Sequence, residues 1–144
     1  MQGKLLLTFV VVGALIVILF LMPLLQRTPL PFVVVMSGSM EPSLKPGDLL
    51  VIKGIKRKKP EIGDIVVYNS RKQGMLIVHR VVDIEDSKGN RVFFTKGDAM
   101  EFVEWERVEM LDVIGYVTWR IRYLGLPTYL VFKTMDRLGR TSSF

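Results

Sequence analysis

The chain has no cysteine and only one histidine. Without cysteine it can form no disulfide, bind no metal through thiolates and use no cysteine nucleophile. A single imidazole also excludes a metal centre built on several histidines, and we expect no bound cofactor. These absences restrict the chemistry that the remaining side chains can supply.

Hydrophobicity and charge set the next limits. The 144 residues leave room for about one domain, and 49% of them are apolar, which argues against intrinsic disorder. The net charge of +6 fits either a nucleic acid or an anionic membrane surface as a partner. No recognition helix, RNP-like aromatic pattern or zinc-finger spacing accompanies this charge, so we expect no nucleic-acid partner.

One uncharged apolar segment, residues 5–25, accounts for much of the hydrophobicity. As a helix it would be roughly 31 Å long, enough to cross the hydrocarbon core of a bilayer. It is too long for the apolar core of a typical signal peptide, and no small-x-small cleavage site follows it. We therefore predict that residues 1–25 hold a single uncleaved transmembrane helix. The flanking charges, Lys4 before it and Arg27 after it, favour a cytoplasmic N-terminus.

A short linker with two prolines, residues 26–31, leads into a β-rich domain over residues 32–144. Gly, Pro, Asn and Asp separate short apolar runs there, which is typical of an antiparallel sheet or barrel. The runs that we predict as strands are 32–35, 48–53, 64–68, 75–82, 92–95 and 113–122. One helix is expected at 127–138, with Pro127 in its first turn. The fold class is thus mainly β, with an N-terminal transmembrane helix.

Two segments leave alternatives open. Residues 53–59 hold five cations and end before Pro60, so they form either a solvated hairpin tip or a contact with lipid headgroups. Residues 119–132 mix aromatic, aliphatic and basic side chains. They form either an edge strand followed by a packing helix, or an interfacial membrane contact, where Trp and Tyr are favoured.

The most informative segment is the turn at residues 36–42, Met-Ser-Gly-Ser-Met-Glu-Pro, which follows an apolar strand. Gly38 permits backbone angles that other residues avoid, and Pro42 keeps the residue before it out of the helical region. The turn should present two hydroxyls, those of Ser37 and Ser39, at the end of a strand. Such a turn suits a nucleophile, although turns rich in serine and glycine also occur without any chemistry.

A histidine and an aspartate add the other groups that acyl transfer requires. His79 lies inside an otherwise apolar strand, where an imidazole is either a structural residue with a partner or a rigidly held general base. Asp98 follows Gly97 at the end of a predicted strand, so its carboxylate can point back over the sheet. A hydroxyl, one imidazole and a carboxylate are together the groups that nucleophilic acyl transfer requires.

Five motifs occur in order along the chain: Ser37-Gly-Ser39-Met-Glu-Pro42, Gly47-Asp48, Gly63-Asp-Ile-Val-Val-Tyr68, Ile77-Val-His79-Arg-Val81 and Thr95-Lys-Gly-Asp98. With the apolar N-terminal segment, they resemble the type I signal peptidases, and specifically the archaeal and endoplasmic-reticulum branch. His79 is the marker of this branch, since bacterial members carry lysine in the equivalent Lys-Arg-Val context. The resemblance covers the anchor and nearly the whole domain.

The resemblance implies a membrane-anchored serine endopeptidase that removes signal peptides from exported preproteins. Its β-rich catalytic domain would lie on the extracytoplasmic or lumenal side of the cell membrane or the endoplasmic-reticulum membrane. It implies that Ser39 is the nucleophile and His79 its general base, and that the Ser37 hydroxyl forms the oxyanion site with the Ser39 amide. The expected partners are preprotein signal peptides, membrane lipid and the protein translocation machinery.

The third catalytic member is open, because the sequence departs from the family pattern there. Asp98 matches the acid of the Gly-Asp motif, and the family has a second acid six residues later. That position is Glu104 rather than aspartate, and Met100 stands where asparagine is typical. We predict that Glu104 orients His79 and that Asp98 supports the site from further away.

Two other interpretations compete with an active signal peptidase. A non-catalytic, membrane-tethered β domain would bind lipid or a protein through its basic loop, and would need neither Ser39 nor His79. A repressor-type Ser-Lys autoprotease is related in pattern, but the anchor and the histidine in place of lysine argue against it.

Overall fold

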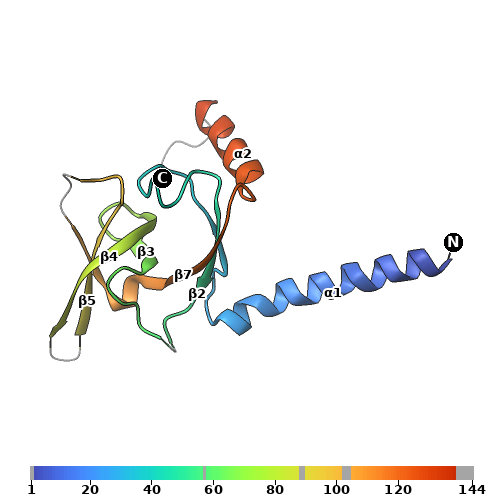
Figure 1. The fold of residues 1–144 in the computed structure, drawn as a ribbon, viewed down its shortest axis with the longest axis horizontal. Helices are drawn as coiled ribbons and strands as arrows, with labels where there is room; N and C mark the ends of the chain where they lie inside the picture. The colour runs from blue at the N-terminus through green and yellow to red at the C-terminus, as the bar shows by residue number, and fades with distance from the viewer. Residues whose placement is uncertain (1, 57, 88–89, 102–104, 139–144) are drawn as a thin grey trace.

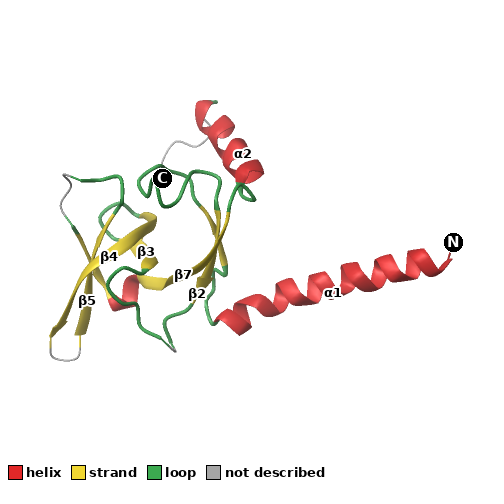
Figure 2. Ribbon diagram, viewed as in Figure 1, coloured by secondary structure: helices red, strands yellow, loops and turns green. Residues whose placement is uncertain are grey.

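A computed structural model describes residues 2–56, 58–87, 90–101 and 105–138 of the chain. One long helix projects from a β domain, and a shorter helix follows the last strand (Figure 1). Figure 2 distinguishes the two helices from the sheet by colour. The predicted fold class, an N-terminal apolar helix followed by a mainly β domain, is confirmed.

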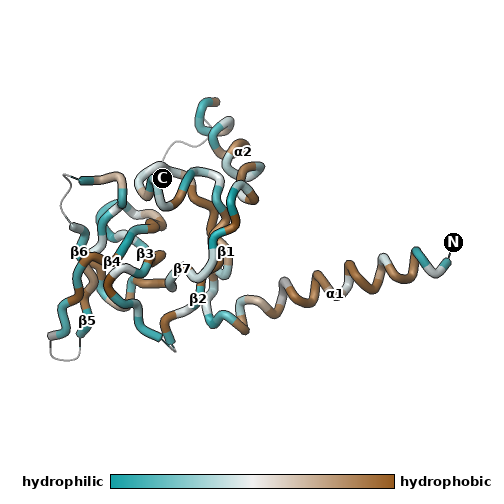
Figure 3. Tube along the Cα trace, in the orientation of Figure 1, coloured by the Kyte–Doolittle hydropathy of each residue, from teal (hydrophilic) through white to brown (hydrophobic). Residues whose placement is uncertain are grey.

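The long helix, α1, spans Gln2–Gln26. Its described apolar side chains are largely exposed, and Figure 3 shows it as a hydrophobic rod beside a domain of mixed polarity. A helix that is apolar on all sides and exposed along most of its described length is typical of a membrane span. By length and composition α1 is able to cross a membrane. It ends at Gln26, because the positive φ of 53° at Arg27 interrupts the helical repeat.

The β domain is one antiparallel sheet of seven strands, in the order β1-β2-β7-β3-β4-β5-β6. The strands are β1 Phe32–Val34, β2 Leu49–Lys53, β3 Ile65–Ser70, β4 Met75–Ser87, β5 Asn90–Lys96, β6 Glu106–Glu109 and β7 Val113–Ile121. A 3₁₀ turn, η1 (Met110–Asp112), leads into β7. The last strand, β7, lies between β2 and β3, so it joins the N-terminal strand pair to the four strands β3 to β6.

Strand β3 has apolar core on both of its faces. Val66 and Tyr68 belong to one cluster, which includes Phe93, whereas Val67 belongs to a second cluster, which includes Met40. Successive side chains of a strand point to opposite faces, so the two clusters lie on the two sides of β3. The polar side chains that these clusters enclose, Tyr68 of β3 and His79 of β4, are therefore buried.

The anchor helix meets the sheet through a backbone contact just beyond β2. The Gly54 amide donates a hydrogen bond of 2.9 Å to the Gln26 carbonyl. A Cβ atom at Gly54 would collide with the Arg27 carbonyl oxygen, so the close approach requires glycine. The end of α1 is thus held at a defined point of the domain.

All six predicted strands are present, with some changes at their ends. β4 continues to Ser87, beyond the predicted end at 82, because its polar outer half still pairs with β5. β6 was missed because only one of its four residues is apolar. That residue, Val108, is buried in the core, and pairing with β5 fixes the strand.

The basic loop follows β2 as predicted, and Arg57 within it lies outside the described residues. Lys58 Nζ lies 3.8 Å from the Glu61 carboxylate and 3.7 Å from that of Asp64. Ion pairs this exposed contribute only about 0–1 kcal/mol. They leave Lys58 free to exchange partners, and contact with lipid headgroups stays a prediction.

The predicted C-terminal helix is present as α2, Leu126–Arg137. Its start is fixed by the Gly125 amide, which donates to the Gly47 carbonyl over 2.9 Å. Gly47 has a φ of 89°, and the Leu126 side chain occupies the space that a Cβ there would need. The described side chains of α2 include none that is buried. Its exposed apolar side chains are Leu130, Val131, Phe132 and Met135. The alternative of an edge strand followed by a packing helix therefore does not fit, since β7 lies inside the sheet between β2 and β3 and α2 buries none of its described side chains. Interfacial contact stays a prediction.

Candidate active site

The serine turn, residues 36–42, is held in place by the backbone on either side of it. The Val35 amide donates to the Asp48 carbonyl and the Gly47 amide donates to the Val35 carbonyl, each over 2.9 Å. Inside the turn, the Met40 side chain is buried in the core. A turn with a buried residue and paired ends presents its two serine hydroxyls in a defined position.

The two hydroxyls of the turn lie close together. Ser37 Oγ and Ser39 Oγ are 3.3 Å apart, with Ser37 exposed and Ser39 half-buried. The Ser39 carbonyl accepts a hydrogen bond of 3.0 Å from the Ala99 amide. This bond docks the serine turn against the loop that follows β5.

The single imidazole faces the serine turn. His79 lies on β4 opposite Val66 of β3, and its side chain is buried. A Cβ atom at Gly97 would lie 3.2 Å from His79 Nε2 and 2.5 Å from the Ser39 carbonyl oxygen. The Nε2 side of the imidazole and the serine turn therefore meet across the space that Gly97 leaves empty.

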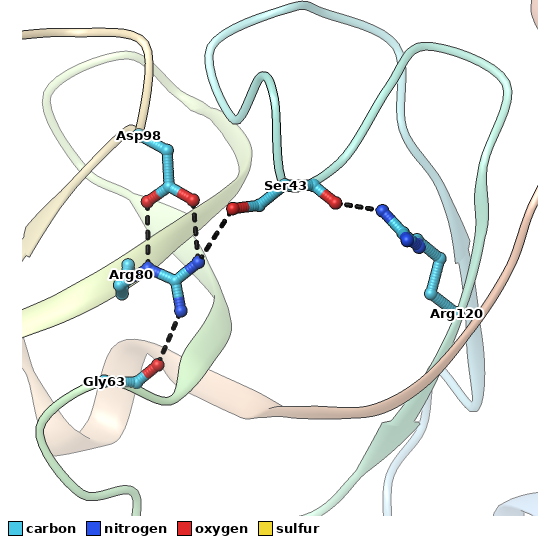
Figure 4. Close-up of polar contacts among 5 residues, drawn as sticks. All are labelled: Ser43, Gly63, Arg80, Asp98 and Arg120. Carbon is cyan, nitrogen blue, oxygen red and sulfur yellow. Dashed lines mark hydrogen bonds and ion pairs between the residues drawn. The ribbon is translucent and has the colours of Figure 1, made fainter.

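Asp98 is bound to an arginine rather than to the imidazole. Arg80 donates from Nε to Oδ1 over 2.9 Å and from Nη2 to Oδ2 over 2.7 Å (Figure 4). The same guanidinium donates to the Gly63 carbonyl over 2.8 Å and to Ser43 Oγ over 3.2 Å. Arg120 in turn donates to the Ser43 carbonyl. This network ties the loops around the site together, and Arg80 holds the pKa of the Asp98 carboxyl below its usual range.

The other side of the imidazole faces a buried hydroxyl network. His79 Nδ1 lies 3.3 Å from Tyr68 Oη, and Tyr68 donates to Glu106 Oε2 over 2.8 Å. Thr95 Oγ1 donates to Tyr68 Oη over 3.1 Å, and Ser70 donates to Glu106 Oε1 over 2.5 Å. Burial raises the pKa of Tyr68; the hydrogen bond from Thr95 lowers it, the hydrogen bond to Glu106 and the charge of Glu106 raise it, and on balance the phenol keeps its proton.

Opposing effects act on the protonation of His79. Burial lowers the pKa of His79, and the negative charges of Glu106 and Asp98 raise it by smaller amounts. The balance favours a neutral imidazole, which is the form that accepts a proton.

A pocket of about 720 Å³ opens beside the imidazole. Its lining includes His79, Tyr68 and Glu106, together with the cationic Lys96 and Arg71. The pocket thus adjoins the side of His79 that faces the hydroxyl network, and the serine turn does not line it.

The structure brings most of the predicted site residues together. Ser39 and His79 both approach Gly97, Ser37 lies beside Ser39, and Asp98 follows Gly97 and pairs with Arg80. Glu104 lies outside the described residues, so its contact with His79 stays a prediction.

Sequence reasoning missed the hydroxyl network and the arginine. Tyr68 and Arg80 stand inside two of the quoted motifs, which is a signal for both. Glu106 has a weaker signal, since it is one of three glutamates in the segment 101–106. Among the described residues no group of histidine and acidic side chains could hold a metal ion.

Comparison with known proteins gives a family for this arrangement. The family model described as "Signal peptidase, peptidase S26" matches residues 5–97. The human protein "Signal peptidase complex catalytic subunit SEC11C" is 36% identical over 109 residues, which cover 70% of this chain and 57% of that protein. The SEC11 subunit of Verticillium alfalfae is 36% identical over 113 residues, covering 72% of this chain and 65% of its own length. The chain thus matches less than two thirds of the length of these relatives.

Proposed function

Because the chain belongs to the signal peptidase family, peptidase S26, we propose that it is a membrane-anchored serine endopeptidase that removes N-terminal signal peptides from exported preproteins. The observation that carries this proposal is the meeting of the Ser39 turn with the Nε2 side of a buried His79 across Gly97. His79 is the only histidine, so no second imidazole can act as base. The relatives are named as catalytic subunits of a signal peptidase complex, which supports the same activity.

The chemistry follows from the roles of these groups. His79 Nε2 takes the proton of the Ser39 hydroxyl as its oxygen attacks the scissile carbonyl carbon. The oxyanion that forms accepts hydrogen bonds from the Ser37 hydroxyl and the Ser39 amide, and one such donor is worth about 2.7–4 kcal/mol in known cases. The imidazolium then protonates the leaving amine as the peptide bond breaks. Water, deprotonated by the same imidazole, releases the signal peptide from Ser39.

The anchor explains how substrate and enzyme meet. A signal peptide reaches the protease from the bilayer, and α1 confines the protease to the same surface. An extended cleavage segment would add main-chain hydrogen bonds to an open strand edge. We place residues 1–4 on the cytoplasmic side and the β domain on the extracytoplasmic or lumenal side. Since the relatives are subunits of a complex, association with other membrane proteins of translocation belongs to the same proposal.

Cleavage of a preprotein by the full chain in liposomes tests this function. We expect the product to have a new N-terminus, and the Ser39→Ala variant to leave the preprotein intact. A serine-directed active-site reagent should label the wild type and not Ser39→Ala. A chain that folds and inserts, but neither cleaves the preprotein nor reacts with the reagent, would be the non-catalytic tethered domain instead.

Adding a methyl group at Gly97 is expected to separate the base from the nucleophile. The new Cβ of Gly97→Ala would lie 3.2 Å from His79 Nε2 and 2.5 Å from the Ser39 carbonyl oxygen, so one of them must move. A misplacement of about 1 Å costs on the order of 10²-fold in turnover. Gly13→Ala is the control, because a Cβ there has open space around it. Wild-type turnover in Gly97→Ala, measured on a preprotein, would show that the two groups do not meet at this point.

Contact between α2 and the membrane is expected to appear as quenching by lipid. The chain has no native cysteine, so Val131→Cys and Leu111→Cys each provide one labelling site. Both positions carry exposed apolar side chains, Val131 on α2 and Leu111 in η1. In liposomes with a lipid-borne quencher, a fluorophore at 131 should be quenched strongly and one at 111 weakly. Equal quenching at the two positions would contradict interfacial binding by α2.

A further inference from the structure

Tyr68 Oη has one proton and three polar neighbours. The neighbours are Glu106 Oε2 at 2.8 Å, Thr95 Oγ1 at 3.1 Å and His79 Nδ1 at 3.3 Å. An ionised carboxylate only accepts hydrogen bonds, so the phenolic proton goes to Glu106. The lone pairs of Oη then accept from Thr95 and from His79. For this to hold, Nδ1 of the imidazole must carry a hydrogen.

The hydrogen bonds at Glu106 point in the same direction. The Gln73 amide donates to Ser70 Oγ over 3.2 Å, and Ser70 donates to Glu106 Oε1. Each carboxylate oxygen of Glu106 therefore accepts a hydrogen bond from a hydroxyl group, one from Ser70 and the other from Tyr68. With hydrogen on Nδ1, every donor between the imidazole and the carboxylate has an acceptor: Nδ1 donates to Tyr68 Oη, and Tyr68 Oη donates to Glu106.

Burial makes this order of protons costly to change. Tyr68 and Thr95 are 0% exposed, and Ser70 and His79 are also buried. In the opposite tautomer, with hydrogen on Nε2, the bare Nδ1 would face the lone pairs of Tyr68 Oη and lose its partner, and such an unpaired buried atom costs about 1–3 kcal/mol. In the part of the chain that the structure describes, every buried side-chain nitrogen and oxygen has a partner.

We infer that Tyr68 is a positioning residue which, together with Glu106, holds His79 in the Nδ1–H tautomer and leaves Nε2 free to accept the Ser39 proton. This inference rests on the proposed function and deepens it. A neutral imidazole with hydrogen on Nδ1 has its lone pair on Nε2, the nitrogen that faces the serine turn. Glu106 places a negative charge one hydroxyl away from the imidazolium that forms during the reaction. A direct carboxylate has this function in other serine proteases.

Asp98 is a poorer candidate for this task. Both oxygens of Asp98 accept hydrogen bonds from Arg80. Arg80 follows His79 in β4, so its side chain points to the opposite face of the strand. Among the described residues, Tyr68 from β3, Glu106 from β6 and Asp98 after β5 act on His79. The pocket beside it is also lined by charged residues: Lys96, Arg71, Lys72, Arg107, Glu109 and Asp112.

The tautomer can be read directly because the chain has one histidine. In full-length protein labelled with ¹⁵N-histidine, one pair of ring nitrogen resonances reports on His79 alone. At a pH where the ring is neutral, we expect protonated Nδ1 and bare Nε2 in the wild type. In Tyr68→Phe we expect a mixture of tautomers. Protonated Nε2 in the wild type, or an unchanged tautomer in Tyr68→Phe, would overturn the inference whether or not the chain cleaves preproteins.

Kinetics in liposomes supply the second readout. Tyr68→Phe and Glu106→Gln should each lower kcat about 10- to 100-fold with little change in KM, less than the roughly 10⁴-fold loss known when a directly bonded triad carboxylate is neutralised. In both variants the acid limb of the pH–rate profile should move to lower pH, because each change removes stabilisation of the His79 imidazolium. Tyr116→Phe, a partly buried tyrosine beside the same apolar cluster, is the matched control and should stay at wild-type turnover.

Glu104→Gln separates this inference from the sequence-based prediction. If Glu104→Gln loses turnover while Glu106→Gln keeps it, Glu104 orients the imidazole and the inference is wrong. If Tyr68→Phe fails to fold, the turnover of Glu106→Gln and the tautomer of His79 in the wild type still test the inference. If the wild type cleaves no preprotein but carries hydrogen on Nδ1 of His79, the proposed function is rejected and the tautomer assignment stands.

Discussion

Ser39→Ala is expected to lower preprotein cleavage by about 10³- to 10⁶-fold, the range seen when a catalytic triad loses a member. The variant removes the only hydroxyl that we place as the attacking group. The turn itself should persist, because the buried Met40 and the backbone bonds of Val35 hold it without that hydroxyl. Initial rates of signal-peptide removal in liposomes, with equal amounts of inserted protein, measure the effect.

Ser37→Ala and Ser87→Ala are the controls for this result. Ser37→Ala should cost less, about 10²- to 10³-fold, because it removes one oxyanion donor and leaves the nucleophile in place. Ser87 lies at the far end of β4, in register with Asn90, and its replacement should have no effect. If Ser39→Ala retains more than a tenth of the wild-type rate, Ser39 is not the nucleophile.

His79→Ala is expected to remove most activity, at about 10³- to 10⁴-fold, because the chain has no second imidazole. In the wild type, kcat/KM should rise with pH as the imidazole loses its proton. Burial lowers the pKa of His79 and outweighs the upward effect of Glu106 and Asp98. The midpoint of this rise should therefore lie below the ordinary histidine value of about 6.5.

A pH–rate profile of the wild type, with enzyme stability checked at each pH, tests this prediction. A profile that is flat between about pH 5 and 8 would count against a neutral imidazole as base. Full activity in a folded His79→Ala would overturn the assignment directly.

The sequence predicts those parts of the site that depend on local pattern. Ser39 could be proposed as nucleophile because the serine turn at residues 36–42 stands at the end of an apolar strand. His79 could be proposed as base because it is the only imidazole and lies in an apolar run. The anchor was equally clear, since a long uncharged apolar helix needs no tertiary partner to be recognised.

The hydroxyl network could not be predicted, because it depends on contacts between distant strands. Tyr68 and Glu106 are 38 residues apart, and β4 and β5 lie between their strands in the sheet, yet the two side chains meet in the folded domain. Glu106 stands in a charged segment that resembles a solvated loop, and the burial of Val108 makes it a strand instead. Similarly, the role of Arg80 depends on the distant loops to which its guanidinium donates hydrogen bonds, so the local sequence does not reveal it.

The contact at Gly54 means that the length of β2 sets the distance between the end of α1 and the serine turn. One end of β2 adjoins the point where α1 is fastened, and the other adjoins Asp48, whose carbonyl holds the base of the serine turn. Five residues of strand span about 17 Å. The serine turn therefore lies at the opposite end of β2 from the anchor (Figure 1). A longer linker at residues 26–31 would not change this distance, whereas one more pair of residues in β2 would move the serine turn about 7 Å further from the end of α1.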